Sequence, residues 1–343
     1  MAIQRIPRDI KPREIAVVQY PGNGILGGLA QVTRTPLPTG EVVQGLNILV
    51  TGVCDIVAVD GLGLSPEHPL PLIRDIQIVA SSRSRPEIGE IKRSDAAAAY
   101  QLAHYFRGTP GLVLPMADAV VQAATPFAFD IDLPFELQHA LNPAMTLLNS
   151  QELASFDLII QWEDATGLII PDVGTETTIT LCQVRVTARE YTDTLTKAAR
   201  YGINRFRTLD IPIPAANAGQ RIDVKGGYYL RGLLIKQFTQ AAGENYHTPV
   251  ATILNGLEFQ LNRNPKVRYP FLAQLDADNK VVYSMELLPV GYTMLDFMRE
   301  KRPDSLIDSR TVDSLELVAD VNFVADGRLR VYPIEVIPVT GRR

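Results

Sequence analysis

Cysteine, histidine and tryptophan are scarce in this chain of 343 residues, which contains two, four and one of them. Cys54 and Cys182 have neither C-x-x-C spacing nor a neighbouring histidine, which favours reduced core thiols over a disulfide or a metal site. No two histidines lie close enough in sequence to form a local ligand pair, and no G-x-S-x-G motif occurs. We therefore expect no cofactor, no metal and no enzymatic activity.

Long apolar runs and clusters of one charge are also missing. No run approaches the ~20 apolar residues of a membrane helix, and the first residues lack the order of a signal peptide, so we expect a soluble protein made in the cytoplasm. The net charge is −5, without the basic surface of a sequence-specific nucleic-acid binder. The exception is segment 1–14, where Arg5, Arg8, Lys11 and Arg13 indicate either a solvated tail or contact with an anionic surface.

Glycine and proline, 24 of each, are spread along the chain between segments rich in Val, Ile, Thr and Tyr, a composition typical of short strands. Phe156–Trp162 and Leu315–Phe323 alternate apolar and polar residues with the period of a half-buried strand. Trp162 falls in phase with the apolar positions, which favours core packing over a sugar-stacking role. The other predicted strands are 45–59, 73–80, 127–133, 178–188, 228–238, 257–261, 281–288 and 329–337.

Three helical segments interrupt the strands. The first covers Asp95–Arg107, with Ser94 as the candidate N-cap and a glycine directly after it. A second, weaker one follows Phe135 but is interrupted by a proline, and a third runs from about Tyr292 until the next proline. Asp276 and Asp278 are interpreted as turn residues rather than as a catalytic pair.

An internal repeat organises the whole sequence. "LLNSQELASFDLI" from Leu147 and "LIDSRTVDSLELV" from Leu306 align without a gap over 13 positions, four of them identical. Four further pairs of segments follow in the same order, starting at residues 35 and 211, 73 and 254, 132 and 287, and 181 and 331. The sequence thus predicts one β-domain duplicated.

The predicted fold class is all-β, with two tandem eight-stranded jelly-roll β-sandwich domains and short helical insertions. The predicted organisation is an N-terminal arm (1–14), a first jelly roll (15–191), a linker (192–200) and a second jelly roll (201–343).

A glycine-rich stretch near the start has the G-x-G-x-x-G spacing of a dinucleotide-binding turn. It comprises Gly22, Gly24 and Gly27, followed by Gly28. Such a turn needs a helix directly after it, but two prolines follow within ten residues and no helical period develops. We therefore interpret these glycines as a hinge that supplies positive-φ turns where the arm enters the first domain.

The duplicated domain, and the helix that enters each half ahead of the repeated strand, carry a family resemblance over Ile15–Pro338. The chain resembles the double jelly-roll major capsid proteins of tailless icosahedral viruses, the lineage from tectivirus-like and corticovirus-like phages to the adenovirus hexon. The resemblance implies a structural protein of a virion, here of a bacteriophage, that forms pseudo-hexameric homotrimers and then a capsid lattice.

The same resemblance implies vertex (penton) and minor capsid proteins as partners. It also places the basic arm on the inner side of the shell, against an internal lipid membrane or genome. A different class, a two-domain β-sandwich adhesin, spike or carbohydrate-binding protein, stays open as the alternative.

Overall fold

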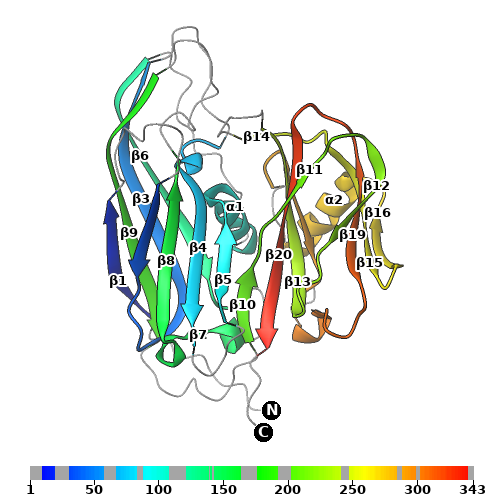
Figure 1. Cartoon of the computed structure of the whole chain (residues 1–343), viewed down its shortest axis with the longest axis horizontal. Coiled ribbons are helices and arrows are strands. Elements are labelled where there is room, and N and C mark those ends of the chain that lie inside the picture. The colour runs from blue at the N-terminus through cyan, green and yellow to red at the C-terminus, as the bar shows by residue number, and fades with distance from the viewer. Residues whose placement is uncertain are drawn as a thin grey trace.

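The computed structural model of the chain describes residues 10–19, 31–57, 67–82, 88–107, 121–138, 140, 143–163, 176–191, 202–240, 247–283, 288–298 and 302–338. Its strands build two antiparallel β-barrels that stand side by side (Figure 1). We call β1 to β9 the first barrel and β10 to β20 the second barrel.

The first barrel consists of two sheets. One has the strand order β1 (Ile10–Gln19), β9 (Glu176–Tyr191), β3 (Val42–Val57) and β6 (Val121–Pro134), with the short β7 (Leu148–Asn149) paired to β3. The other has the order β2 (Val32–Pro36), β8 (Ser155–Trp162), β4 (Ile73–Ser81) and β5 (Glu90–Ser94). Among the eight main strands, the chain changes sheet at every connection except that from β4 to β5. This winding is that of a jelly roll.

The second barrel repeats the same order. In one sheet β10 (Gly202–Phe206) and β11 (Leu209–Pro212) both pair with β20 (Gly327–Pro338), which pairs with β13 (Tyr229–Thr239). β17 (Tyr292–Asp296) and the short strands β14 (Thr248–Pro249) and β18 (Ile307–Asp308) also pair with β13. The other sheet has the order β12 (Asn217–Asp223), β19 (Leu315–Val321), β15 (Leu254–Leu261) and β16 (Asn264–Tyr269). The predicted fold class is confirmed.

The repeated serine of the sequence alignment has the same role in both barrels. The backbone N–H and the hydroxyl of Ser150 both donate to the carbonyl of Glu41, and those of Ser309 both donate to the carbonyl of Tyr228. Each serine thereby connects the end of a short strand, β7 or β18, to the residue directly before the long strand, β3 or β13. Two polar groups of one residue satisfy a single carbonyl, which explains why both copies need a small hydroxyl side chain.

A glycine marks the same irregularity in both barrels. The pairing register shifts between Val43 and Gly45 in β3, and between Leu230 and Gly232 in β13. A Cβ on Gly45 would lie 3.1 Å from the carbonyl oxygen of Leu133, and one on Gly232 would lie 2.6 Å from the equivalent oxygen in β17. The neighbouring strand approaches too closely for any side chain.

Of the four flanking repeat pairs, two are confirmed and two are wrong. The segments at 73 and 254 lie in β4 and β15, and those at 181 and 331 lie in β9 and β20, which are equivalent strands. The segment at 35 lies in β2, whereas that at 211 lies in β11, which belongs to the other type of sheet. The segment at 132 ends β6, whereas that at 287 precedes β17. These two matches rest on short proline-containing turns, which occur between many strands.

One predicted helix is confirmed and two are wrong. α1 covers Ala96–Arg107, but its cap is Asp95 rather than Ser94, since the Asp95 carboxylate accepts from the N–H of Ala98 at 2.7 Å. The second predicted helix is reduced to a 3-10 turn, Pro143–Thr146, because its proline cannot continue an α-helix. The third lies in β17, whose five residues are all buried and therefore lack the alternation that marks a half-buried strand.

The predicted strand 281–288 is also wrong at its start. Residues Leu272–Tyr283 form α2, which includes the Asp276 and Asp278 that we interpreted as turn residues. The segment contains several good helix formers, and Gln274, Asp278 and Lys280 lie exposed on the helix instead of in a turn.

The first barrel begins earlier than predicted. β1 starts at Ile10, inside the segment assigned to the arm, and pairs with β9 along its length. Lys11, Pro12 and Arg13 give no apolar alternation, but an edge strand needs only backbone hydrogen bonds, and it tolerates proline and charge. The predicted linker 192–200 lies outside the described residues, so the domain boundaries stay predictions.

Each barrel has its own apolar core. Trp162 is fully buried in the first core, where its indole N–H donates to the Thr33 hydroxyl at 2.9 Å, as its phase in the strand predicted. Cys54 and Cys182 are buried free thiols of the same core, and burial raises their pKa to about 11 and about 12. The thiols are therefore unreactive packing residues.

Candidate functional site at the interface between the barrels

α1 lies between the two barrels and packs against both (Figure 1). Ala96, Ala97, Ala99 and Tyr100 belong to the core of the first barrel. Its opposite face, formed by Ala98, Leu102, Tyr105 and Phe106, packs against the outer face of the second barrel's long sheet. That face contributes Phe206, Leu234, Tyr292, Met294, Tyr332 and Ile334. Because both faces of α1 are covered, the helix has apolar residues all around instead of on one side.

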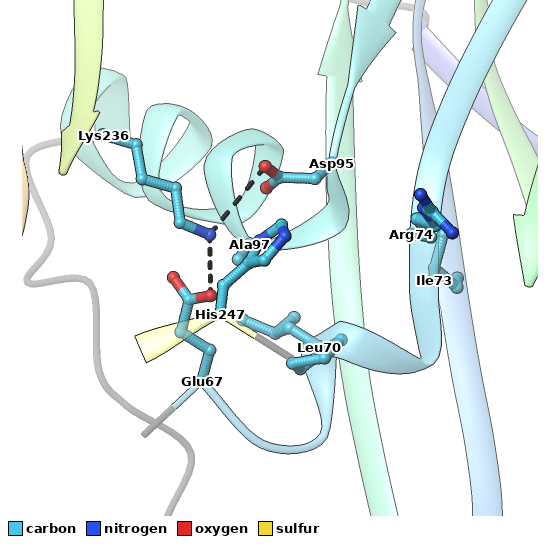
Figure 2. Close-up of a pocket in the computed structure, with 9 residues that line it drawn as sticks. Glu67, Leu70, Ile73, Arg74, Asp95, Ala97, Lys236 and His247 are labelled. Atoms are coloured by element: carbon cyan, nitrogen blue, oxygen red, sulfur yellow. Dashed lines mark hydrogen bonds and ion pairs between the residues drawn. The ribbon is translucent and has the colours of Figure 1, made fainter. Parts of the chain in front are cut away.

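A buried cluster of ionisable groups accompanies this apolar contact (Figure 2). The Lys236 ammonium of β13 lies 2.7 Å from the Glu67 carboxylate and 3.8 Å from that of Asp95. Arg330 of β20 donates to Asp95 at 3.0 Å. The two carboxylates come from the first barrel and the two cations from the second, so each ion pair joins the barrels. We call these four residues the interbarrel cluster.

Two tyrosines of the second barrel complete the hydrogen bonding of the cluster. The hydroxyl of Tyr292 donates to Glu67, and that of Tyr332 donates to Asp95. Burial raises the pKa of both tyrosines well above 10, so each hydroxyl keeps its proton and remains a donor.

The two carboxylates of the cluster differ in their pKa. Burial raises the pKa of Glu67, although Lys236 opposes the shift. Burial acts in the same direction on Asp95, but Lys236 and Arg330 together outweigh it, and the net pKa of Asp95 is lowered. Asp95 is therefore the firmly ionised member, held between two cations.

His247 lies beside the cluster without adding charge to it (Figure 2). Its ring centroid is 4.4 Å from that of Phe238. Burial, and then the nearby Lys236 and Arg330, lower its pKa well below 6.5. The imidazole is therefore neutral at physiological pH.

Two further cations are buried where the barrels meet. The Lys92 ammonium of β5 lies 3.7 Å from the ring centroid of Phe206 in β10, and burial lowers the pKa of Lys92 well below its usual range. The Arg231 guanidinium of β13 lies 3.9 Å from the ring centroid of Phe106 in α1. Each contact places a cation of one barrel over an aromatic face of the other.

A polar cleft of about 340 Å³ opens next to the interbarrel cluster. Two of its arginines pair with its own aspartates, Arg93 with Asp75 at 3.2 Å and Arg330 with Asp210 at 3.1 Å, whereas Arg74 pairs with Glu163 at 3.7 Å. In the described part of the chain, no group of three or more His, Cys, Asp or Glu side chains is placed to hold a metal ion. These ion pairs of the cleft each lie within one barrel, so the ion pairs that join the barrels here are those of the interbarrel cluster.

The predicted site residues that the structure describes lie in β1, away from this interface. Arg13 is in β1, where its guanidinium donates to Glu190 at 2.7 Å, and the backbone of Lys11 is in the same strand. Arg5 and Arg8 lie outside the described residues. The predicted hinge glycines, Gly22, Gly24, Gly27 and Gly28, also lie outside them.

The sequence reasoning missed the interbarrel cluster, although one signal for it was present. β13 reads "YLRGLLIKQFT", with Arg231 and Lys236 inside an otherwise apolar run. A charged residue at a core position must be paired, because isolated burial of a charge is costly. The partners Glu67 and Asp95 had no comparable signal, since they sit at a loop and a helix start.

These elements define a class of fold: the double jelly roll, two barrels of identical winding joined through α1. In the described ranges, no helix has the length and apolar character needed to cross a membrane. No family model and no curated protein sequence matches the chain.

Solved structures share the fold over nearly the whole chain. The structure described as the STIV MCP has a TM-score of 0.63 at 12% identity, covering 95% of this chain and 97% of that one. The PBCV-1 virus capsid gives 0.58 at 12% identity, covering 98% and 95%. The major capsid protein P2 from bacteriophage PM2 gives 0.55 at 13% identity, covering 95% and 99%. At these identities the likeness establishes the double jelly-roll fold.

Proposed function

We propose that this chain is the structural major capsid protein of an icosahedral virus and that it has no enzymatic role. The observation that carries the proposal is the complete double jelly roll, whose full length corresponds to proteins described as major capsid proteins. None of the three compared structures is described as an adhesin or a carbohydrate-binding protein, so no observation favours that alternative.

The proposed assembly unit is a homotrimer with pseudo-hexagonal shape. Each chain supplies two barrels of the same winding, so three chains in a ring give six similar sides, which suit a shell lattice. In this proposal the protein resides in the virion shell, and vertex and minor capsid proteins are its other partners. A bacteriophage origin stays a prediction.

The basic arm is proposed to face inward, toward a membrane or the genome. Arg13 is already paired with Glu190, so this contact depends on Arg5, Arg8 and Lys11. The glycines from Gly22 to Gly28 follow β1, which pairs with β9, so the hinge proposed for them acts on the connection from β1 to β2 and not on the arm before Ile10.

Native mass spectrometry and electron microscopy of the purified chain test the assembly. Three chains of 37.8 kDa give about 113 kDa, and hexagonal particles are expected in negative stain. A chain that stays monomeric at every concentration, or that forms a trimer without hexagonal outline, contradicts the proposed assembly unit.

A further inference from the structure

The two helices of this duplicated fold differ sharply in exposure. α1 is buried on both faces because its outer face contacts the second barrel. α2 occupies the same place in the second barrel, between β16 and β17, and among its residues 272–281, whose burial is described, only Leu275 and Asn279 are buried. Phe271, directly before α2, is 66% exposed and Val281 is 83% exposed. Large apolar side chains are thus exposed at α2, whereas the corresponding side of α1 is covered by the second barrel.

The strand registers show which surface corresponds to the one that receives α1. Gly45 and Gly232 each follow the same register shift and are therefore equivalent positions. Leu49 lies four residues after Gly45, and Lys236 lies four residues after Gly232, so these two residues are also equivalent and lie on the same face of their sheets. Leu49 pairs with Arg185 in β9, as Lys236 pairs with Arg330 in β20. The first barrel therefore has its own copy of the receiving sheet, formed by β1, β9, β3 and β6.

Among the described residues, no other element packs on this copy of the receiving sheet in the way that α1 packs on the second barrel. Leu49 is 36% exposed. Val17 of the neighbouring strand β1 pairs with Arg185 of β9 and is 46% exposed. At the covered copy, Asp95 directly before α1 meets Lys236. At the uncovered copy, an exposed leucine stands where Lys236 stands, and an exposed phenylalanine precedes the helix. Leu49 and Phe271 are thus the apolar counterparts of Lys236 and Asp95.

We propose that α2 of one chain docks on the outer face of β1, β9, β3 and β6 of a second copy, in the way α1 docks within the chain. Phe271 then packs against Leu49 and Val17, and Val281 takes the role of Tyr105, which is likewise the tenth residue of its helix. This inference rests on the proposed function, and it assigns the surface that joins the chains of the capsid unit.

Charge supports the same pairing. Asp278 is exposed at the helix position that Leu102 occupies in α1, and Arg189 stands at the sheet position of Ile334. Leu102 and Ile334 belong to the same apolar cluster at the covered interface. Arg189 also binds Asp132 at 2.6 Å, and the Tyr269 hydroxyl also donates to Asp278, so the opposite charges that replace the apolar pair already have partners within the chain. The contact uses two different surfaces of the chain, so it propagates head to tail, and it closes into a ring when the rotation between neighbours is that of the proposed trimer.

Disulfide trapping tests the contact directly. The double variant Leu49→Cys with Phe271→Cys should give covalently linked dimers and trimers on a non-reducing gel after mild oxidation. The natural cysteines are buried and do not compete. The matched control is Leu49→Cys with Phe323→Cys, because Phe323 is 57% exposed but lies outside the proposed surface. It should remain a single chain on the gel.

Charge substitution provides an independent measurement. Phe271→Asp and Leu49→Asp should each raise the concentration at which half of the trimer dissociates by about tenfold or more, whereas Phe323→Asp should leave it unchanged. Circular dichroism should show an intact fold in all three, since the side chains are exposed.

The outcomes separate the inference from the proposed function. A wild-type trimer that survives both substitutions, or links equally in the control pair, overturns the assigned surface and leaves the capsid proposal standing. A cross-link within one chain also overturns it. A wild-type chain that never associates overturns the proposed trimer, and the inference with it.

Discussion

Lys236 is the residue on which the internal contact between the barrels depends most. It is 1% exposed, and both of its carboxylate partners, Glu67 and Asp95, are also buried. A buried ion pair contributes little compared with an apolar replacement of both partners, but removing one partner leaves an uncompensated charge in a medium of low polarity. The cluster is therefore sensitive to any single substitution.

Lys236→Met tests this sensitivity. Methionine keeps the length of the apolar stem but leaves Glu67 and Asp95 facing each other, so we expect the free energy of unfolding to fall by about 3–5 kcal/mol in urea titrations. Arg268→Met is the control, because Arg268 is 72% exposed and its pair with Glu258 is solvated. It should cost less than about 1 kcal/mol. Equal losses in the two variants would contradict a structural role for the cluster.

At the scale of elements, the long strands β3 and β13 set the register of both barrels. Each contains a shift in pairing at a glycine, and each approaches the next strand closely at that point. The position of Gly232 tolerates no Cβ because the nearest atom is a backbone oxygen, which cannot rotate away as the Arg189 side chain beside Gly45 can.

Gly232→Ala should therefore destabilise the protein, although alanine usually suits a strand better than glycine. The new Cβ would lie 2.6 Å from the carbonyl oxygen of Leu295, and we expect a loss of about 1–3 kcal/mol by urea or thermal unfolding. Gly219→Ala in β12 is the matched control, since its nearest atom is 3.9 Å away. It should be neutral or slightly stabilising. A neutral Gly232→Ala would show that the strands can separate at little cost.

At the scale of the whole molecule, the barrels form one unit because the interface between them is built like a core. α1 contributes to the core of the first barrel and to the apolar cluster that it shares with the second barrel. The ion pairs, cation–aromatic contacts and hydrogen bonds at its border all join the same two bodies.

Cutting the chain between the barrels should therefore not separate them. With a protease site introduced within residues 192–200, the cleaved protein should elute in gel filtration with both fragments together. Leu102→Asp in the cut protein should release the fragments, because it places a charge in the shared apolar cluster. His104→Asp, on a less buried position of the same helix, should not. Separation of the cut wild-type chain would contradict a permanent interface.

Local patterns predicted much of this fold. The alternation in Phe156–Trp162 identified β8, the alanine-rich run identified α1, and the aligned serines identified equivalent turns. The failures share a cause. β17 is buried on both faces and α2 is exposed on most of its surface, so neither shows the contrast between two faces on which periodicity depends.

That the chain is a duplicated β-protein can be read from its residues alone, because period-two burial and repeated residues are properties of neighbouring positions. How the two copies meet depends on contacts between distant parts of the chain. Lys236 and Glu67 are 169 residues apart, and no local pattern relates them. Their contact exists because α1 docks on the second barrel, and that docking leaves the equivalent helix, α2, uncovered. The same repeat thus produces one buried interface and one exposed surface, a difference that arises from packing and not from the pattern of either copy.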